Sequence, residues 1–147
     1  MLISSCLGMQ QRSLLKKPLR WGVFEVSEDC PIVFVYGTLK RGECRAHFLS
    51  EGTYLGLGKT VPQFRLYDCG EYPGLVLASS GVSVEGEVWQ ITDRIVAALD
   101  IEEGVDMGLY RRETVTLLPP FHTLNVETYL FQHEVEGLPD AGTVWNS

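Results

Sequence analysis

The sequence predicts a small α+β domain with a mixed, largely antiparallel β-sheet and short flanking helices. Apolar runs rich in β-branched and aromatic residues recur between residues 32 and 131, and short turn segments separate them. Helical signals are confined to two segments, 43–49 and 92–104. A chain of 147 residues can bury about 70% of the surface that its unfolded form exposes, which suits one hydrophobic core.

The first thirty residues differ in character from the rest of the chain. They are basic, contain no acidic residue before Glu25 and show no sustained apolar periodicity. Apolar residues precede the basic ones, which is the reverse of the order in a secretory signal. Trp21–Val26 alternates weakly and indicates an edge strand. We expect a flexible N-terminal extension over residues 1–30 and a folded domain over residues 31–147.

Composition and charge argue against several kinds of partner. The formal net charge of −7 and the pI near 4.9 disfavour nucleic-acid binding, which requires clustered Lys and Arg. No segment has the roughly 20 apolar residues needed to cross a bilayer, so we expect no membrane partner. The four cysteines form no Cys-x-x-Cys pair, so we expect reduced thiols in a cytoplasmic protein. The sequence gives no indication of oligomeric state.

A buried strand and the loop after it form the first candidate site. Ile32–Tyr36 is apolar throughout and stops at Gly37, which indicates a strand that ends in a turn. Thr38 is a candidate helix N-cap, so we expect a strand, a tight loop and a helix start. Such a loop leaves the N–H groups of Tyr36, Gly37, Thr38 and Leu39 free for an anion or a developing oxyanion. A phosphate-binding domain is less favoured, because a nucleotide cradle has more glycines.

A short helix is predicted over Glu43–Leu49, with Cys44 and His47 on one face. This spacing is compatible with a metal site or a thiol catalyst. No second pair of ligands lies nearby in the sequence, so we interpret the segment as an ordinary helix surface and expect no metal.

From Tyr54 onward the signals are almost all β. Strands are predicted at Tyr54–Thr60 and Gln63–Tyr67, and the short loops around them indicate an antiparallel meander. Pro73-Gly74 is predicted to be a turn, which either lines a site or merely reverses the chain.

Val84–Ile91 alternates apolar and polar residues as a half-buried strand does. Gly86 interrupts the strand and indicates a bulge or a close approach by another backbone or a ligand. Glu85 and Glu87 are candidate catalytic groups, but alternation favours surface positions for both.

The second candidate site lies at the end of a predicted helix over residues 92–104. Thr92 is the predicted N-cap, Gly104 is the predicted C′ residue, and the apolar stripe that includes Leu99 continues to Glu102 and Glu103. Either the helix frays and both glutamates point to water, or a carboxylate is partly buried. In the second case desolvation first, and nearby like charges second, would raise the pKa of Glu103 and suit it to general base chemistry.

A hairpin is predicted from Tyr110–Leu118 and Leu124–Phe131, connected by the loop Pro119–Thr123. Tyr110 either supplies a phenolic hydrogen bond to the site or packs in the core. The predicted core positions of the hairpin are Val115, Leu117, Val126 and Leu130.

Four spaced blocks resemble the gamma-glutamylcyclotransferase-like family, which includes gamma-glutamylamine cyclotransferases and AIG2-like plant proteins. The blocks are Tyr36-Gly37-Thr38-Leu39 with Lys40-Arg41-Gly42, then Tyr72-Pro73-Gly74-Leu75-Val76, then Gly86-Glu87-Val88-Trp89, and finally Leu99-Asp100 with Glu103 and Leu109-Tyr110-Arg111. The resemblance spans about residues 33–131 and implies a sheet that curls toward a barrel. The interval from Glu103 to Tyr110 is one residue longer than in gamma-glutamylamine cyclotransferases.

The resemblance implies an enzyme that cyclises a gamma-glutamyl group to 5-oxoproline and releases an amine or amino acid without a cofactor. It assigns Glu103 as the general acid/base and places the substrate at Tyr36, Gly37, Thr38, Leu39 and Tyr110. The expected partner is therefore a small gamma-glutamyl compound. The alternative is a non-catalytic, AIG2-like module that binds a small ligand or regulates another protein.

Overall fold

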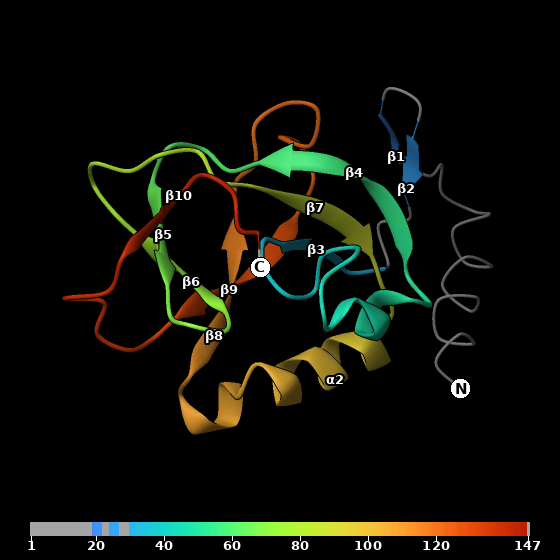
Figure 1. Ribbon diagram of the computed structural model, residues 1–147. Helices are drawn as coiled ribbons and strands as arrows, with labels where there is room; N and C mark the ends of the chain where they lie inside the picture. Colours follow the sequence, from blue (N-terminus) through green and yellow to red (C-terminus); the bar gives the residue numbers. More distant parts are fainter. Residues whose placement is uncertain (1–18, 22–23, 27–29, 147) are drawn as a thin grey trace.

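The computed structural model describes residues 19–21, 24–26 and 30–146 (Figure 1). Its larger sheet has five strands, which in spatial order are β4 (Thr53–Lys59), β7 (Glu85–Gln90), β3 (Ile32–Val35), β9 (Val126–Phe131) and β8 (Tyr110–Val115). The central strands β3 and β9 are parallel, and the other neighbours are antiparallel. This confirms the prediction of a mixed, largely antiparallel sheet.

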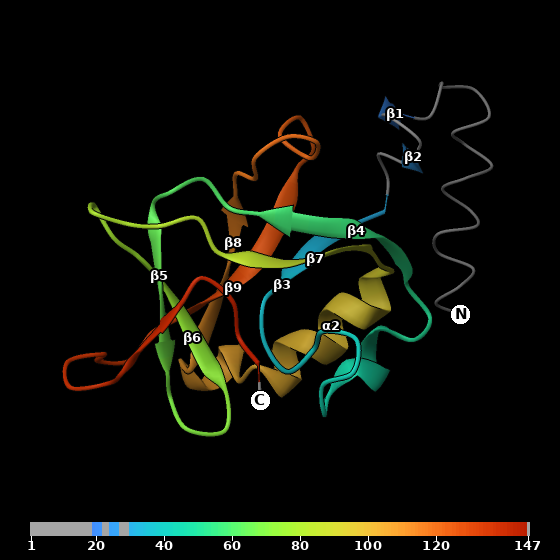
Figure 2. The ribbon, with the colours of Figure 1, turned by 45° about the horizontal axis from the view of Figure 1, so that its top comes forward.

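A second sheet has three strands, which in spatial order are β10 (Asp140–Gly142), β5 (Phe64–Asp68) and β6 (Pro73–Leu77). The α-helix α2 (Asp93–Glu102) and two 3₁₀ helices, η1 (Ala46–Leu49) and η2 (Val105–Met107), complete the domain. In both views β7 and β3 lie between β4 and α2 (Figures 1 and 2).

The core forms two apolar clusters. Leu99 of α2 packs in one cluster with Val33, Val35 and Trp89 of the large sheet. The other cluster joins the large sheet to the small one and contains the fully buried Phe34, Leu66, Leu75, Val88 and Val126. Because successive residues of β3 point to opposite faces, the strand contributes to both clusters. This burial on both faces explains its uninterrupted apolar sequence.

The predicted meander is wrong, because consecutive strands separate into different sheets. β4 pairs with β7, whereas β5 pairs with β6. Pro73-Gly74 lies in strand β6, so the predicted turn at this position is also wrong.

The expected barrel is also wrong, because the five-stranded sheet stays open. Its outer strands, β4 and β8, meet at an isolated bridge between Thr60 and Leu117, beyond the ends of both strands. They therefore do not pair along their length.

The predicted helix over Glu43–Leu49 is shorter than expected and is a 3₁₀ helix over Ala46–Leu49. Cys44 is exposed with a free thiol, and Cys69 is also free. Cys30 is in a disulfide, which contradicts the expectation of reduced thiols at this position.

Trp21–Val26 does not form an edge strand of the larger sheet. β1 (Leu19–Trp21) and β2 (Phe24–Val26) pair with each other as a small hairpin. Most of the predicted extension over residues 1–30 lies outside the described residues, so its boundary with the domain stays a prediction.

Four predictions about the strands are confirmed. β7 lies within the predicted Val84–Ile91, and β8 and β9 form the predicted antiparallel hairpin. The four predicted core residues of that hairpin are buried. Gly86 marks a close approach, since a Cβ there would lie 2.4 Å from the carbonyl oxygen of Val35.

Candidate active site

The loop after β3 is a series of turns and does not begin a helix. The N–H of Lys40 donates to the carbonyl of Gly37 at 3.1 Å, and the N–H of Arg45 donates to the carbonyl of Thr38 at 2.8 Å. The Thr38 hydroxyl accepts a hydrogen bond from Nε of Arg45 at 2.7 Å. Thr38 is therefore not an N-cap, and no helix dipole adds to the field at this loop.

The loop nevertheless presents backbone donors, as predicted. Among the described residues, no protein acceptor binds the N–H groups of Gly37, Thr38 or Leu39. Thr38 and Leu39 are each 4% exposed. Buried N–H groups without acceptors are costly, so these donors can bind a ligand oxygen or water.

Glu103 lies at the C-terminal end of α2 and is buried. Thr92 caps the N-terminus by accepting from the N–H of Ile95 at 3.2 Å, and Gly104 ends the helix in the left-handed conformation (φ +64°). Both caps confirm the predicted helix. Glu103 is 6% exposed, whereas Glu102 is exposed. The helix does not fray before Glu103, and the stripe that includes Leu99 ends in a buried carboxylate.

A recess brings the two candidate sites together. Its lining includes Tyr36, Gly37, Thr38, Leu39, Glu103 and Tyr110, which are the six residues predicted to form the site. Pro73 and Tyr129 also line it, so the Pro73-Gly74 segment contributes to a candidate site although it is not a turn. The recess is narrow, with about 20 Å³ open to a water-sized sphere. This is little more than one buried water requires.

Arg45 is a charged lining residue that sequence reasoning missed. Its Nη2 lies 3.4 Å from Oε2 of Glu103, and its Nη1 lies 3.0 Å from Oε2 of Glu102. With Nε on Thr38, the guanidinium connects the loop to the end of α2. The two segments are 58 residues apart in the chain, so no local pattern in the sequence indicates this contact.

Burial raises the pKa of Glu103 above its ordinary value of 4.5, and the positive charge and hydrogen bond of Arg45 oppose that rise. The negative charge of Glu102 raises the pKa further. This agrees with the predicted order of desolvation first and like charge second, but the prediction omitted Arg45. Oε1 of Glu103 has no hydrogen-bond partner among the described residues, so this oxygen is available to carry a proton.

Three tyrosines enclose the carboxylate. The hydroxyl of Tyr110 donates to the carbonyl of Pro73 at 2.6 Å, and the hydroxyl of Tyr36 donates to the carbonyl of Tyr129 at 2.6 Å. The hydroxyl of Tyr129 donates to Asp100 at 2.7 Å. Burial raises the pKa of all three phenols, so they stay neutral at physiological pH. Tyr110 both packs and hydrogen-bonds, but its proton is committed to Pro73.

Gly37 is required by close packing. A Cβ at this position would lie 2.6 Å from Cγ of Pro73, inside contact distance with a rigid ring. β6 therefore presses against the loop and fixes the direction of its N–H groups.

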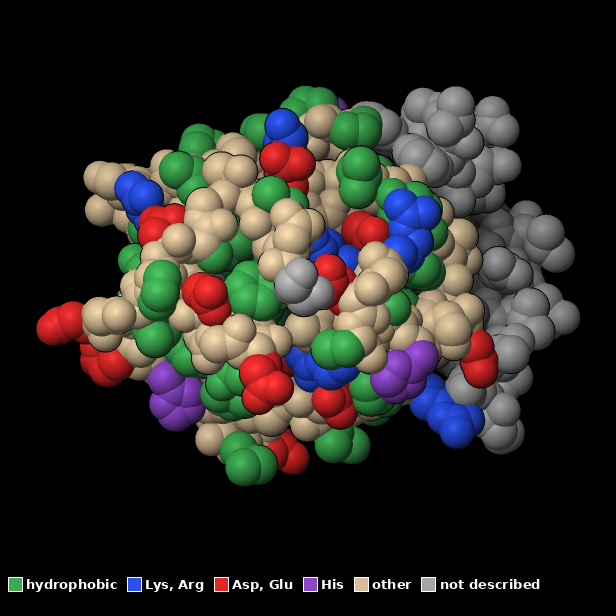
Figure 3. Space-filling view, in the orientation of Figure 1, with side chains coloured by type: hydrophobic (Ala, Val, Ile, Leu, Met, Phe, Trp, Pro, Cys, Tyr) green, Lys and Arg blue, Asp and Glu red, His purple; other side chains and the backbone are tan. Residues whose placement is uncertain are grey.

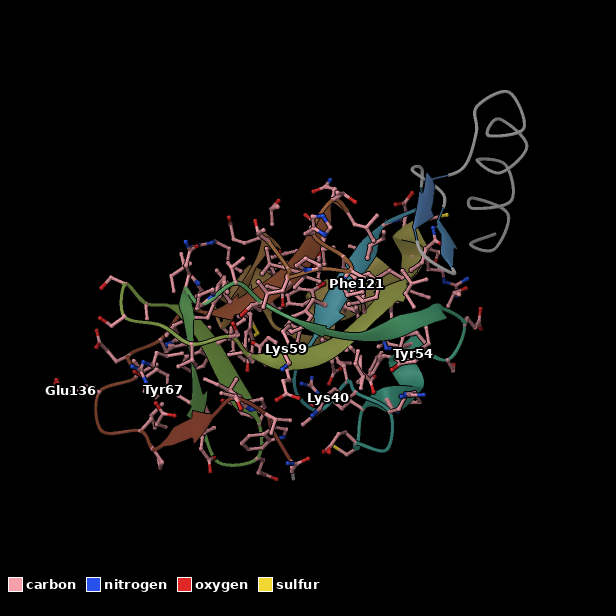
Figure 4. The ribbon with its side chains drawn as sticks, turned by 90° about the horizontal axis from the view of Figure 1, so that it is seen from above. Lys40, Tyr54, Lys59, Tyr67, Phe121 and Glu136 are labelled. Atoms are coloured by element: carbon pink, nitrogen blue, oxygen red, sulfur yellow. The ribbon has the colours of Figure 1, made fainter. Side chains whose placement is uncertain are left out.

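A second cavity of about 420 Å³ lies between β4, β7 and the Pro119-Pro120 loop. Its lining includes Lys40 and Lys59, both labelled in Figure 4. It also includes Glu87, which was predicted to be a surface charge but is 5% exposed. Glu87 accepts hydrogen bonds from Trp89 Nε1 and from two nitrogens of Arg41. This cavity is the larger of the two, but its buried carboxylate is fully paired, so we place the candidate chemistry in the narrower recess.

Charges of both signs lie side by side on the face shown in Figure 3. Among the described residues there is no cluster of three or more potential metal ligands. No helix in the described part of the chain is both long and apolar enough to span a bilayer.

The sequence and fold match known proteins. The family model described as "Gamma-glutamyl cyclotransferase, AIG2-like" matches residues 33–147. The chain belongs to this family. A putative gamma-glutamylcyclotransferase of Vibrio cholerae is 41% identical over 111 residues, which cover 76% of this chain and 92% of the relative. Human gamma-glutamylaminecyclotransferase is 38% identical over 89 residues, which cover 55% of this chain and 58% of the human protein.

The fold of this family member also resembles a solved structure. The crystal structure of an AIG2-like protein from Mus musculus superposes with a TM-score of 0.71 and is 26% identical. The match covers 80% of this chain and 88% of the mouse protein. The membership confirms the family that the four sequence blocks indicated.

Proposed function

We propose that this chain cyclises the gamma-glutamyl group of a small molecule to 5-oxoproline and releases an amine or amino acid. The observation that carries the proposal is the placement of buried Glu103 in the same recess as the unpaired N–H groups of Gly37, Thr38 and Leu39. A carboxylate and amide donors around one small cavity are the two kinds of group that this reaction needs.

The reaction balances with one carboxylate. The α-ammonium of the gamma-glutamyl group loses a proton to Glu103 and then attacks the γ-carbonyl carbon, which forms the ring C–N bond. Glu103 returns the proton to the leaving nitrogen as the original C–N bond breaks. The ring nitrogen still carries a second proton after the attack, and it loses this proton to the released amine, which leaves as an ammonium ion. The raised pKa of Glu103 suits both steps, because the group must accept and then donate a proton near working pH.

The loop supplies the electrostatic part of catalysis. The tetrahedral intermediate carries negative charge on the former carbonyl oxygen, and the substrate carries a permanent α-carboxylate. Backbone N–H donors can bind either oxygen, and a positioned donor of this kind is worth about 3 kcal/mol in comparable sites. Because Pro73 presses on Gly37, these donors are held in place before substrate arrives.

The narrow recess also sets a requirement for the reaction. A gamma-glutamyl group is larger than the space open to a water-sized sphere, so binding requires lining side chains to move apart. The substrate must also fold on itself for ring closure, and an enclosing pocket favours that conformation.

The test is release of 5-oxoproline from four substrate classes: gamma-glutamyl amines, gamma-glutamyl amino acids, gamma-glutamyl dipeptides and gamma-glutamyl-lysine. We expect release from at least one class, and its loss in Glu103→Gln. Asp106→Asn is the matched control, since Asp106 is an exposed carboxylate in the adjacent 3₁₀ helix. Equal release by wild type and Glu103→Gln would remove Glu103 from the mechanism.

The second candidate is a small-ligand-binding module without turnover. The narrowness of the recess favours it, because a recess that opens only slightly would hold a compact ligand and exclude a whole substrate. Calorimetry with 5-oxoproline separates the two candidates when combined with the release assay. Binding without release from any substrate class would support the module.

A further inference from the structure

We propose that Arg45 is a positioning residue that holds the Glu103 carboxylate in the recess and keeps it ionised until substrate binds. This inference rests on the proposed function for its consequence in catalysis. Its structural content, an arginine that controls the ionisation of a buried glutamate, can be tested in the ligand-free protein.

The geometry gives Arg45 three anchors. Nε donates to the Thr38 hydroxyl at 2.7 Å, Nη1 contacts Glu102 at 3.0 Å, and Nη2 contacts Glu103 at 3.4 Å. The side chain is 22% exposed, so most of it is shielded from water. The shorter contacts to Thr38 and Glu102 fix the guanidinium plane. The longer contact places the positive charge of Arg45 next to Glu103, and the two groups do not form a close bidentate pair.

The other groups around Glu103 cannot perform this role. Tyr36, directly after β3, faces it together with Tyr110 of β8 and Tyr129 of β9, and burial keeps all three phenols neutral. Glu102 adds a like charge from the same helix. Arg45 is therefore the cation that opposes desolvation of Glu103 among the described residues.

The arrangement also connects the two halves of the site. Thr38 belongs to the loop that presents the unpaired N–H groups, and Glu103 belongs to the end of α2. Because one guanidinium contacts both, Arg45 sets the distance between the donor loop and the carboxylate. When a catalytic group is misplaced by about 1 Å, the rate falls on the order of 10²-fold.

The experiment is an NMR titration of side-chain carboxyl carbons in glutamate-labelled protein. The Glu103 signal is assigned by its loss in Glu103→Gln. We compare wild type, Arg45→Gln, Arg45→Lys and Arg94→Gln. Arg94 is exposed at the other end of α2, so its variant loses the same charge away from the recess.

We expect Arg45→Gln to move the Glu103 titration to higher pH, because desolvation then acts unopposed. Arg45→Lys keeps the charge without the planar fork and should move the titration less. Arg94→Gln should leave the pH of the Glu103 titration unchanged. An unchanged Glu103 titration in folded Arg45→Gln would overturn the proposal. Loss of folding in both Arg45 variants would also overturn it, because it would show that Arg45 serves stability.

The catalytic consequence has a separate readout. In Arg45→Gln the acidic limb of kcat/KM against pH should move in the same direction as the NMR titration, and kcat at pH 6 should fall on the order of 10²-fold. If no substrate yields 5-oxoproline, the proposed function fails, while the titration still tests Arg45. A moved titration with an unmoved activity profile would contradict the role of Arg45 in catalysis.

Discussion

Two carboxylates are buried among the described residues, Glu87 and Glu103, and each contacts an arginine of the loop after β3. Glu87 accepts three hydrogen bonds at 3.0–3.2 Å from Arg41 and Trp89, so both of its oxygens are paired. Glu103 has one long contact to Arg45 and an oxygen without a partner. Burial alone therefore does not identify a reactive carboxylate. The difference lies in how completely its hydrogen bonds are satisfied.

The largest expected effect separates these two residues by activity. Glu103→Gln should lower turnover by roughly 10² to 10⁴, because the variant cannot relay a proton. Glu87→Gln should leave the turnover of the folded protein close to that of wild type. The measurement is the rate of 5-oxoproline release per folded molecule. A larger loss of turnover in Glu87→Gln than in Glu103→Gln would contradict our assignment of Glu103 to catalysis and Glu87 to structure.

The next effect concerns the donor loop beside Glu103. Gly37→Val should abolish ligand binding, because the new side chain would meet the ring of Pro73 and displace the N–H groups. Calorimetry with 5-oxoproline measures this loss. Gly42→Ala is the control, since a Cβ at Gly42 meets nothing within 4 Å, although its φ of +84° adds strain. Affinity retained in Gly37→Val would show that the loop is only a turn.

The positions of the helix before Glu103 and of strand β3 could be predicted from local features of the sequence. The caps Thr92 and Gly104 define the helix, and the stripe through Leu99 leads to Glu102 and Glu103. Helical spacing therefore indicates a carboxylate at the end of the buried face, and the structure buries Glu103 and leaves Glu102 exposed. The apolar run of β3 likewise predicts a strand that is buried on both faces.

Features that depend on distant segments could not be predicted. Glu87 alternates like a surface residue, and its burial depends on Arg41, which is 46 residues away. Arg45 has no pattern of its own, since it lies in irregular turns and meets α2 only in the folded chain. The pairing of β4 with β7 instead of β5 is a third case, because strand propensity does not specify the partner.

A smaller effect tests Glu87 as a structural group. Glu87→Gln replaces an acceptor by an amide N–H that faces the donors of Arg41 and Trp89, so at least one hydrogen bond is lost. We expect a loss of about 1–3 kcal/mol in the free energy of unfolding. Urea denaturation measures it, with Glu85→Gln as the exposed control on the same strand. Equal stability of the two variants would show that the pairing of Glu87 contributes little.

The smallest effect is a pH-dependent change in stability at Glu103. Since its pKa is raised in the folded state, ionisation favours unfolding, so the wild type loses stability as pH rises through that pKa. Glu103→Gln does not ionise and avoids this loss. The melting temperature of the variant relative to wild type should therefore rise as pH increases from 4.5, the ordinary pKa of a glutamate, through the raised pKa of Glu103. A melting-temperature difference between variant and wild type that is constant with pH would contradict the raised pKa of Glu103.

The most direct test of the central claim locates the ligand by NMR. Amide signals are followed while 5-oxoproline, the proposed product, is added to the full chain. The account predicts that the largest shifts fall on Gly37, Thr38, Leu39 and Gly104, around the narrow recess. Largest shifts on Gly58, Lys59 and Gly86, around the second cavity, would contradict it.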